Sequence, residues 1–191
     1  SEPGDPPAAF RGEPGSASGK VEGIVGAQRL LTINTGSSSL KAALYCLREN
    51  TTETPEIRAE ASRIGGRGGG LRLADDRGET LEERRDDLPD HSAALDTLLS
   101  RLRDRGVDRD DLAAVGHRIV HGGDRHREPQ WVTPGVIADL RALVPIDPNH
   151  LPQAIAAIEA VGRAYPAVPQ VACFDTAFHG RMPRVARLYG L

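Results

Sequence analysis

Three short segments of the sequence gather the residues that could do chemistry. They are Asn34–Lys41, which is rich in Gly and Ser, Gly116–Asp124, which holds an arginine between two histidines, and Phe174–His179, which holds an aspartate. Each lies at the end of an apolar run, where a strand would give way to a turn. Small residues, hydroxyls, cations and a carboxylate in such positions suggest a site that handles phosphate or another anion.

The segment Asn34–Lys41 has the composition of a phosphate-binding turn. Small residues let backbone N–H groups approach a phosphate closely. The three serines at 37–39 add hydroxyl donors, Lys41 adds a positive charge, and Asn34 can orient a phosphate oxygen or a metal-bound water. The segment is not a Walker loop, because the Gly-x-x-x-x-Gly-Lys-Ser/Thr pattern is missing. Gly and Ser also dominate ordinary hairpin turns, and composition alone favours that simpler interpretation.

Arg118 is the central residue of the second segment. It lies near the end of a predicted strand at 112–120, just before the Gly122-Gly123 turn. Ligands of open α/β sheets bind at such strand ends, and the planar fork of arginine matches a carboxylate or a phosphate. The alternative is a structural ion pair between Arg118 and Asp124 or another acid. We expect His126, beyond the turn and among charged residues, to be solvated.

Asp175 directly follows the apolar run at 171–174 in the third segment. A carboxylate just past a buried strand commonly holds a metal ion or acts as a base. It can equally cap the segment that follows, since Asp is a favoured N-cap residue. Both interpretations stay open from the residues alone.

Hydrophobic periodicity predicts the elements that must position these segments. It predicts strands at 30–33, 40–47, 56–64, 71–73, 112–120 and 171–174 and helices at about 90–106, 134–145 and 152–165. We expect the charged run 75–90 to be a solvated loop or an exposed hairpin. Because a hairpin comes first and helices then alternate with buried strands, the pattern predicts a mixed α/β sheet with helices packed on it. The wholly apolar strand at 171–174 suggests a sheet covered on both faces.

Composition limits the class of protein. The chain has 191 residues, which suggests one domain plus a tail, and the Pro- and Gly-rich segment 1–27 is expected to be disordered. The net charge of −3 is too small to indicate a nucleic-acid surface. The sequence has neither an apolar run long enough to span a membrane nor a signal peptide, so we expect a cytoplasmic protein. Cys46 and Cys173 have no zinc-ligand spacing and are expected to be buried, reduced thiols.

The three segments, in this order, resemble the acetate kinase family of the actin-like, sugar-kinase and chaperone ATPase superfamily. The resemblance rests on residues 33–41, 116–123 and 171–183, with lesser echoes at 63–65, 90–91 and 143–145. It implies an actin-like, ribonuclease H-like fold in which residues 28–191 form the N-terminal domain. It also implies a C-terminal nucleotide-binding domain that is absent from this chain.

The resemblance also implies roles for single residues. Asn34 would help to hold magnesium and the transferring phosphoryl group, Arg118 would bind the carboxylate, and Asp175 would lie beside the reacting centre and the metal. The remaining positions are implied to bind ligands: Ser37 and Ser39 would line the turn, Lys41 would bind nucleotide phosphates, and Val120 would form an apolar wall for the acyl group.

The implied reaction is the reversible conversion of ATP and acetate to ADP and acetyl phosphate with Mg²⁺ or Mn²⁺. A carboxylate is already ionised at neutral pH, so the difficulty is to bring it against the polyanionic ATP. Arg118 therefore suits a clamp, and Asp175 suits a metal or positioning residue better than a general base. Propionate or another short-chain acid is an alternative substrate, since one methylene is worth only ~1–3 kcal/mol. The resemblance further implies a homodimeric parent enzyme.

Two departures weaken the implied activity. The family usually carries a histidine after a Leu-Ala-Pro-Leu stretch, whereas this chain has Asp147 near that position and His150 further on. Family members are also roughly twice as long, so we expect the isolated chain to be inactive. A non-catalytic or regulatory remnant of the fold remains open, as does a sugar or alcohol kinase in which Asp175 would be the base.

Overall fold

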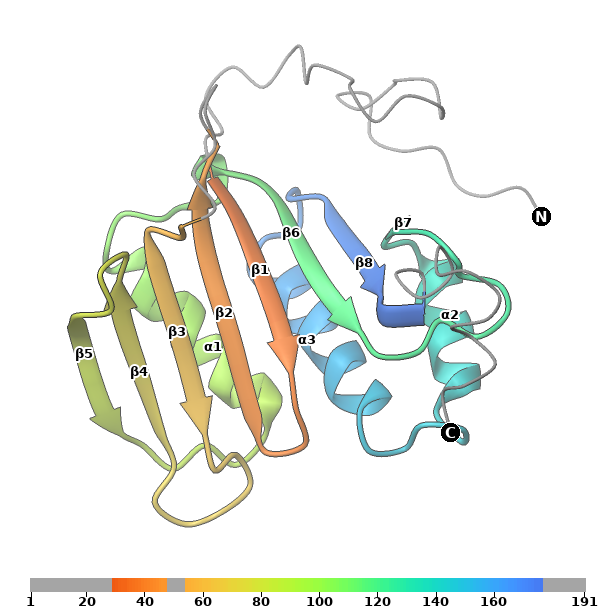
Figure 1. Ribbon diagram of the computed structural model, residues 1–191, viewed down its shortest axis with the longest axis horizontal. Coiled ribbons are helices and arrows are strands. Elements are labelled where there is room, and N and C mark those ends of the chain that lie inside the picture. The colour runs from red at the N-terminus through yellow and green to blue at the C-terminus, as the bar shows by residue number, and fades with distance from the viewer. Residues whose placement is uncertain (1–28, 48–53, 177–191) are drawn as a thin grey trace, which may run out of the picture.

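The computed structural model describes residues 29–47 and 54–176, which form one mixed sheet with helices packed on it (Figure 1). The expected disorder of residues 1–27 and the end of the third segment, 177–179, lie outside the described residues. The strands are β1 (Arg29–Thr35), β2 (Ser39–Cys46), β3 (Ile57–Ser62), β4 (Gly70–Asp75), β5 (Thr80–Arg85), β6 (Leu112–Ile119), β7 (Gln130–Trp131) and β8 (Gln170–Phe174). The helices are α1 (His91–Arg103), α2 (Pro134–Leu143), α3 (Leu151–Ala164) and the 3₁₀ turn η2 (Arg109–Asp111).

The strand order places β1 near the middle of the sheet. The order is β5-β4-β3-β2-β1-β6-β8-β7, with β1 to β5 joined as antiparallel neighbours. Strands β6 and β8 instead run parallel to β1 and to each other, and they are connected through α2 and α3. The carboxyl ends of β1, β6 and β8 therefore meet at one edge of the sheet.

Local sequence signals explain where the helices begin. Asp90 caps α1 by accepting a 2.8 Å hydrogen bond from the Ala93 N–H, which would otherwise lack a partner in the first turn. Thr133 caps α2 in the same way, and Pro134 follows it at the first helical position, where its missing N–H costs nothing. The sequence-based prediction of these two helix starts is confirmed.

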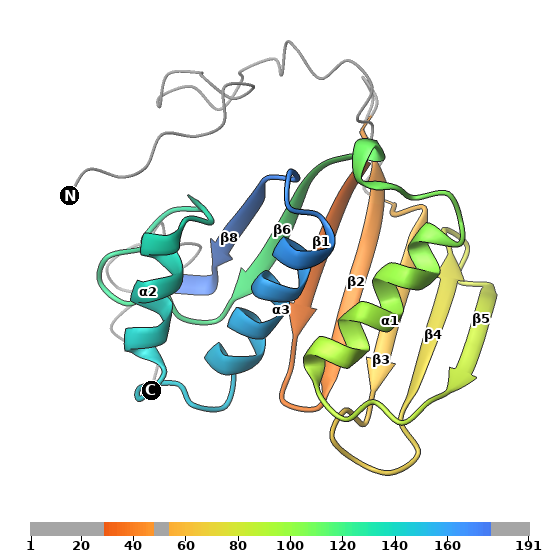
Figure 2. The ribbon, with the colours of Figure 1, turned by 180° about the vertical axis from the view of Figure 1, so that it is seen from behind.

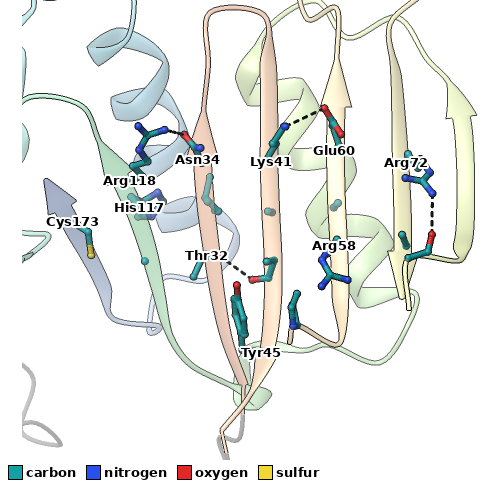
Figure 3. Close-up of a pocket in the computed structure, with 18 residues that line it drawn as sticks. Thr32, Asn34, Lys41, Tyr45, Arg58, Glu60, Arg72, His117, Arg118 and Cys173 are labelled. Carbon is teal, nitrogen blue, oxygen red and sulfur yellow. Dashed lines mark hydrogen bonds and ion pairs between the residues drawn. The ribbon is translucent and has the colours of Figure 1, made fainter. Parts of the chain in front are cut away.

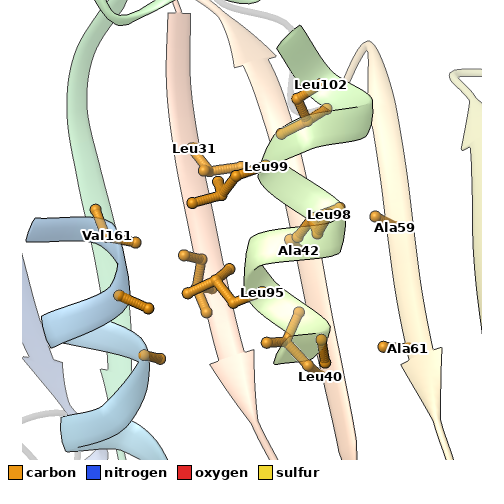
Figure 4. Packing of buried hydrophobic residues seen from close by; sticks show 14 of the residues in the cluster. Leu31, Leu40, Ala42, Ala59, Ala61, Leu95, Leu98, Leu99, Leu102 and Val161 are labelled. Carbon is orange, nitrogen blue, oxygen red and sulfur yellow. The ribbon is translucent and has the colours of Figure 1, made fainter. Parts of the chain in front are cut away.

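Helices α1 and α3 cover one face of the sheet (Figure 2). The leucines of α1 pack onto alternate residues of β1 and β2, and Val161 of α3 joins the same cluster (Figure 4). The buried residues drawn and labelled there are Leu31, Leu40, Ala42, Ala59, Ala61, Leu95, Leu98, Leu99, Leu102 and Val161. A second cluster, which includes Leu140, Ile158 and Phe174, joins α2 and α3 to β8. Burial of these side chains fixes which face of each strand is turned toward the helices.

The opposite face of the sheet is open in the part of the chain that the structure describes. The expectation of a sheet covered on both faces is therefore wrong for these residues: Val171 is only half-buried, and Cys173 on the same face is exposed. The expectation of two buried thiols is wrong as well, since Cys46 is half-buried. An apolar run alone does not say whether anything packs on the second face.

The charged run before α1 contains the edge strand β5. The exposed-hairpin alternative for this run is confirmed, because β5 pairs with β4 and nearly all of its residues are exposed. Glu82 is the half-buried exception, and it forms ion pairs with Arg101 and Arg105 at 3.6 and 2.8 Å. The two-residue strand β7 was not predicted. No helix among the described residues has the length and apolar character that a bilayer crossing requires.

His126 is buried, so the expectation that it is solvated is wrong. Its ring stacks on Phe174 with centroids 5.2 Å apart, and its Nε2 lies 3.2 Å from an Asp139 carboxylate oxygen. Gly122 makes this packing possible. A methyl group on Gly122 would come within 2.5 Å of the His126 carbonyl oxygen and 2.7 Å of Phe174 Cδ1.

We expect Gly122→Ala to destabilise the fold by roughly 1–3 kcal/mol, because the added methyl group overpacks the His126–Phe174 contact. Gly116→Ala is the matched control: a methyl group there would meet only Thr32 Cγ2, at 4.0 Å. It should be neutral or stabilising by up to about 1 kcal/mol. Urea denaturation followed by circular dichroism measures both values, and equal losses would contradict the steric argument.

Candidate functional site

Asn34, Arg118 and Asp175 come together at the edge where β1, β6 and β8 end. Asn34 lies directly beside Arg118 in the parallel register of β1 and β6, and Arg118 lies beside Cys173 in that of β6 and β8. Asp175 follows immediately after β8. Residues from three segments that are distant in the sequence thus form one polar cluster. This edge is the usual location of ligand sites in open α/β sheets.

The Arg118 guanidinium forms a two-pronged ion pair with Asp175. Its Nε donates to one carboxylate oxygen at 2.9 Å, and its Nη2 donates to the other at 2.7 Å. A longer hydrogen bond of 3.4 Å joins its Nη1 to the Asn34 side-chain oxygen. The hydrogen bonds and the negative charge of Asp175 raise the pKa of Arg118 above its ordinary value. The alternative that Arg118 pairs with Asp124 is wrong. The alternative that it pairs with another acid is confirmed, and that acid is Asp175.

The Nη1–Nη2 edge of Arg118 keeps donors for a second anion. A guanidinium has five N–H groups, and a carboxylate can be bound at either of its two forked edges. Asp175 occupies the Nε–Nη2 edge, while the one contact of the other edge with residues 29–47 and 54–176 is the long hydrogen bond to Asn34. About half of the Arg118 side chain is exposed. Asp175 therefore fixes the orientation of a cation that can still bind a ligand.

The predicted phosphate turn is shorter than the sequence suggested. Asn34 and Thr35 belong to β1, Ser39 begins β2, and only 36–38 connect the two strands. The Gly36 N–H donates to the Ser39 carbonyl at 2.8 Å, which closes the hairpin. A β-carbon on Gly36 would lie 2.8 Å from Ser39 Oγ, so this position leaves little room for a side chain.

Two contacts from outside the hairpin hold this turn. The His91 ring, buried at the start of α1, places Nε2 2.7 Å from the Gly36 carbonyl oxygen. The Ile64 N–H donates to the Ser38 carbonyl at 3.0 Å. The sequence did not reveal the contact that His91 makes. There, His91 was only part of a predicted helix start and a weaker point of similarity to the family. Only the fold reveals that it contacts a turn far away in the sequence.

Lys41 and Val120 flank the cluster. Lys41 lies directly opposite Asn34 in the β1–β2 ladder, is well exposed, and pairs loosely with Glu60 at 3.7 Å. Val120 is half-buried and directly follows β6, two residues after Arg118. Ser37 is exposed at the tip of the turn, and Ser39 is half-buried where β2 begins.

A shallow hollow of about 700 Å³ extends from this cluster across the open face of the sheet (Figure 3). Asn34, Lys41 and Arg118 lie at one end, and Tyr45 lies toward the other. Small residues such as Ala43 and Gly116 form part of its floor. The space beside the cluster is therefore large enough for a ligand bigger than a two-carbon acid.

His117 shows how burial divides neighbouring residues of one strand. Its side chain points to the helix-covered face, is almost fully buried, and has Nε2 2.8 Å from the Gln170 side-chain oxygen. Burial lowers the pKa of His117 from 6.5 to about 4, an effect that the hydrogen bond to Gln170 only partly offsets. His117 is therefore neutral at neutral pH, and its hydrogen bond to Gln170 joins β6 to β8 on the helix-covered face.

The oxygen atoms of Asn34 and Asp175 suit a magnesium ion. Mg²⁺ is usually held by one or two carboxylates together with substrate phosphates and water, rather than by a cage of protein ligands. No group of three or more His, Cys, Asp or Glu side chains forms such a cage within 29–47 and 54–176. The oxygen atoms of Asn34 and Asp175 would fit a magnesium ion that is also bound by the phosphates of a nucleotide.

Comparison with known proteins shows the family of the chain. The model of the acetokinase family matches residues 29–191. The chain belongs to the acetokinase family. It is 38% identical over 165 residues to an acetate kinase of Bacillus cereus, and the match covers 85% of this chain and 40% of that relative. It is 41% identical over 163 residues to the acetate kinase of Deinococcus radiodurans, covering 84% and 39% of the two chains.

Solved structures of the family share the fold. The crystal structure of Porphyromonas gingivalis acetate kinase superposes with a TM-score of 0.72 at 32% identity, covering 83% of this chain and 40% of that one. A propionate kinase from Francisella tularensis gives a TM-score of 0.71 at 26% identity, covering 83% and 39%. The predicted family and the mixed α/β, actin-like fold are confirmed. This acetokinase-family chain spans about 40% of the length of these relatives.

We expect His117 to make the fold acid-sensitive. Because the folded state lowers the pKa of His117, the contribution of this residue to stability is fully present above about pH 6.5. It is lost as the pH falls from 6.5 toward about 4, because over this range the imidazole binds a proton in the unfolded chain but not in the folded one. At about pH 4.5 this group alone should cost roughly 2–3 kcal/mol relative to neutral pH. Urea denaturation of the wild type and of His117→Gln at both pH values measures it. Parallel losses in the two proteins would refute the assignment.

Proposed function

We propose that the Asn34–Arg118–Asp175 cluster belongs to an enzyme that phosphorylates a short-chain carboxylic acid, with acetate as the first candidate and ATP as the donor. The reaction would be reversible and would use Mg²⁺ or Mn²⁺. The observation that carries the proposal is the convergence of an amide, a guanidinium and a carboxylate where β1, β6 and β8 end. Membership of the acetokinase family supports it.

Arg118 is proposed to bind the acid through its Nη1–Nη2 edge. The carboxylate would replace the long contact to Asn34 and would leave the ion pair with Asp175 in place. A bound acetate is already ionised at neutral pH, so no residue has to remove a proton from it. Arg118 instead lowers the repulsion between acetate and the triphosphate and aligns the attacking oxygen.

The transfer itself is a displacement at phosphorus. A carboxylate oxygen of acetate forms a bond to the γ-phosphorus of ATP while the bond from that phosphorus to the β–γ bridging oxygen breaks, which gives acetyl phosphate and ADP. A divalent ion, when bound, would neutralise charge on the phosphates, and Asn34 and Asp175 would contribute oxygen ligands to it. Asp175 therefore acts in this proposal as a metal and positioning residue and not as a general base.

The remaining candidate residues are proposed to bind the two substrates. Ser37 and Ser39 would line the phosphates at the hairpin turn, and Lys41 would exchange its loose pair with Glu60 for a phosphate oxygen. Val120, half-buried and two residues after Arg118 in the sequence, would limit the length of the acyl chain. A propionate kinase among the similar structures keeps propionate as a second candidate acid.

Catalysis is proposed to require more chain than these 191 residues. The chain spans about 40% of its acetate kinase relatives, and the adenine-binding part would lie in the remaining sequence. We further propose a cytoplasmic homodimer without nucleic-acid partners for the complete enzyme. A non-catalytic remnant of the fold is the competing hypothesis.

We expect Arg118→Ala in the full gene product to lower kcat/KM for acetate about 10- to 100-fold, since a hydrogen bond to a charged group contributes roughly 1.5–3 kcal/mol. Arg118→Lys should recover only part of this loss, because an ammonium cannot form the fork. Arg84→Ala, which removes an exposed arginine from the edge strand β5, is the matched control. Unchanged acetate kinetics in Arg118→Ala would rule out the assigned role.

We expect the isolated 191-residue chain to form no acyl phosphate and the full gene product to form it. Trapping the product with hydroxylamine in the presence of ATP, Mg²⁺ and acetate or propionate measures this directly. Turnover by the short chain alone would contradict the need for further sequence. Absence of turnover by the full product with every short-chain acid would favour the non-catalytic hypothesis.

A further inference from the structure

We infer that His91 is a positioning residue for the phosphate turn, and this inference rests on the proposed function. His91 lies at the first position of α1 and is buried, with 8% of its surface exposed. Its Nε2 lies 2.7 Å from the carbonyl oxygen of Gly36, which is 55 residues away in the sequence. Because a carbonyl oxygen can only accept, Nε2 carries the proton and donates it.

This hydrogen bond fixes the direction of a peptide group in the turn. In a planar trans peptide the C=O and the N–H point in opposite directions. The Gly36 carbonyl is directed at His91 on α1, so the N–H of Ser37 in the same peptide unit is directed away from α1. Helix α1 covers the face of the sheet opposite to the one from which Asn34 and Arg118 project. His91 therefore turns a backbone donor away from the core and leaves it for a ligand.

A second hydrogen bond from outside the hairpin also orients a peptide group of this turn. The Ser38 carbonyl accepts from the Ile64 N–H at 3.0 Å, so two carbonyls of the turn are bound by groups outside the hairpin. Backbone N–H groups of such a turn form a concave site for phosphate oxygens when their carbonyls are tied down on the other side. Preorganised donors of this kind stabilise transferring phosphoryl groups without reorganisation during the reaction.

The chemistry of this contact predicts which substitutions are tolerated. The nitrogen of a glutamine side chain can take the place of His91 Nε2, whereas the shorter asparagine cannot reach Gly36. Leucine fills the buried space and removes the donor. In the full gene product, Leu and Asn at position 91 should lower kcat roughly 10- to 100-fold, because small misplacements of binding groups have effects of this size. Gln should stay within about threefold of wild type, and KM for acetate should change little, since Arg118 is untouched.

Thr97→Val is the matched control on the same helix. It removes the Thr97 hydroxyl, which donates to the Ala93 carbonyl at 2.8 Å within α1, and it touches no part of the turn. The control should keep the kcat of wild type. Since Gln and Asn are both polar and differ mainly in reach, their comparison remains decisive even when Leu prevents folding. Equal kcat values for His91→Asn and His91→Gln would overturn the inference.

Hydrogen–deuterium exchange of the peptide spanning the turn separates this inference from the proposed reaction. Addition of Mg·ATP should protect the turn amides in wild type, His91→Gln and Thr97→Val, and protect them much less in His91→Leu and His91→Asn. This pattern without turnover of any acid would uphold the role of His91 and reject the proposed reaction. Lack of protection in wild type, or equal protection in all variants, would reject the role of His91.

Discussion

The parallel register of β1, β6 and β8 is the constraint that organises both the core and the polar cluster. It places Asn34 beside Arg118 and brings Asp175 within hydrogen-bond distance of Arg118. Side chains alternate between the faces of a strand, so a slip of one residue would turn Arg118 into the core and bring His117 to the open face. The helix-side burial of Val115, His117 and Ile119 makes that slip unfavourable. Packing on the helix-covered face therefore determines which polar side chains project from the open face.

Two neighbouring residues of β6 show how the covered and the open face change the pKa of ionisable groups in opposite ways. His117 faces the helices, where burial lowers its pKa to about 4 and keeps the imidazole neutral. Arg118 faces the open side, where its guanidinium is charged and where the hydrogen bonds to Asp175 and the negative charge of that residue raise its pKa further. A buried charge without a partner would be costly, whereas a charge in a partly solvated ion pair is tolerated and can exchange partners. The sheet therefore carries the charged side chain of Arg118 on its open face and the neutral imidazole of His117 on its covered face.

The supports of the site lie on the covered side and in the loops. Gly122 leaves room for the stack of His126 on Phe174, the residue before Asp175. His91 and the Ile64 N–H bind the carbonyls of the turn after β1. None of Gly122, His126, Phe174 and His91 is among the residues that line the hollow. The proposed ligand residue Arg118 and the packing residues beneath it, such as His117 and Ile119, thus come from opposite faces of the same sheet.

Short-range patterns in the sequence were enough to predict most elements, the three candidate segments and the family, while long-range contacts came only from the fold. Apolar periodicity and caps such as Asp90 are properties of a few neighbouring residues, so α1, α2 and the central strands could be predicted from them. The candidates Asn34, Arg118 and Asp175 could be named because residue type and strand end are also visible locally. Their mutual contact could not, because it spans 84 and 57 residues of sequence. Burial could not be predicted either: His126 is surrounded by charged residues in sequence yet is buried against Phe174, because what packs on a face comes from elsewhere in the chain. The same reason hid the bond from His91 to Gly36, since a helix start and a hairpin turn become neighbours only when α1 packs on β1 and β2.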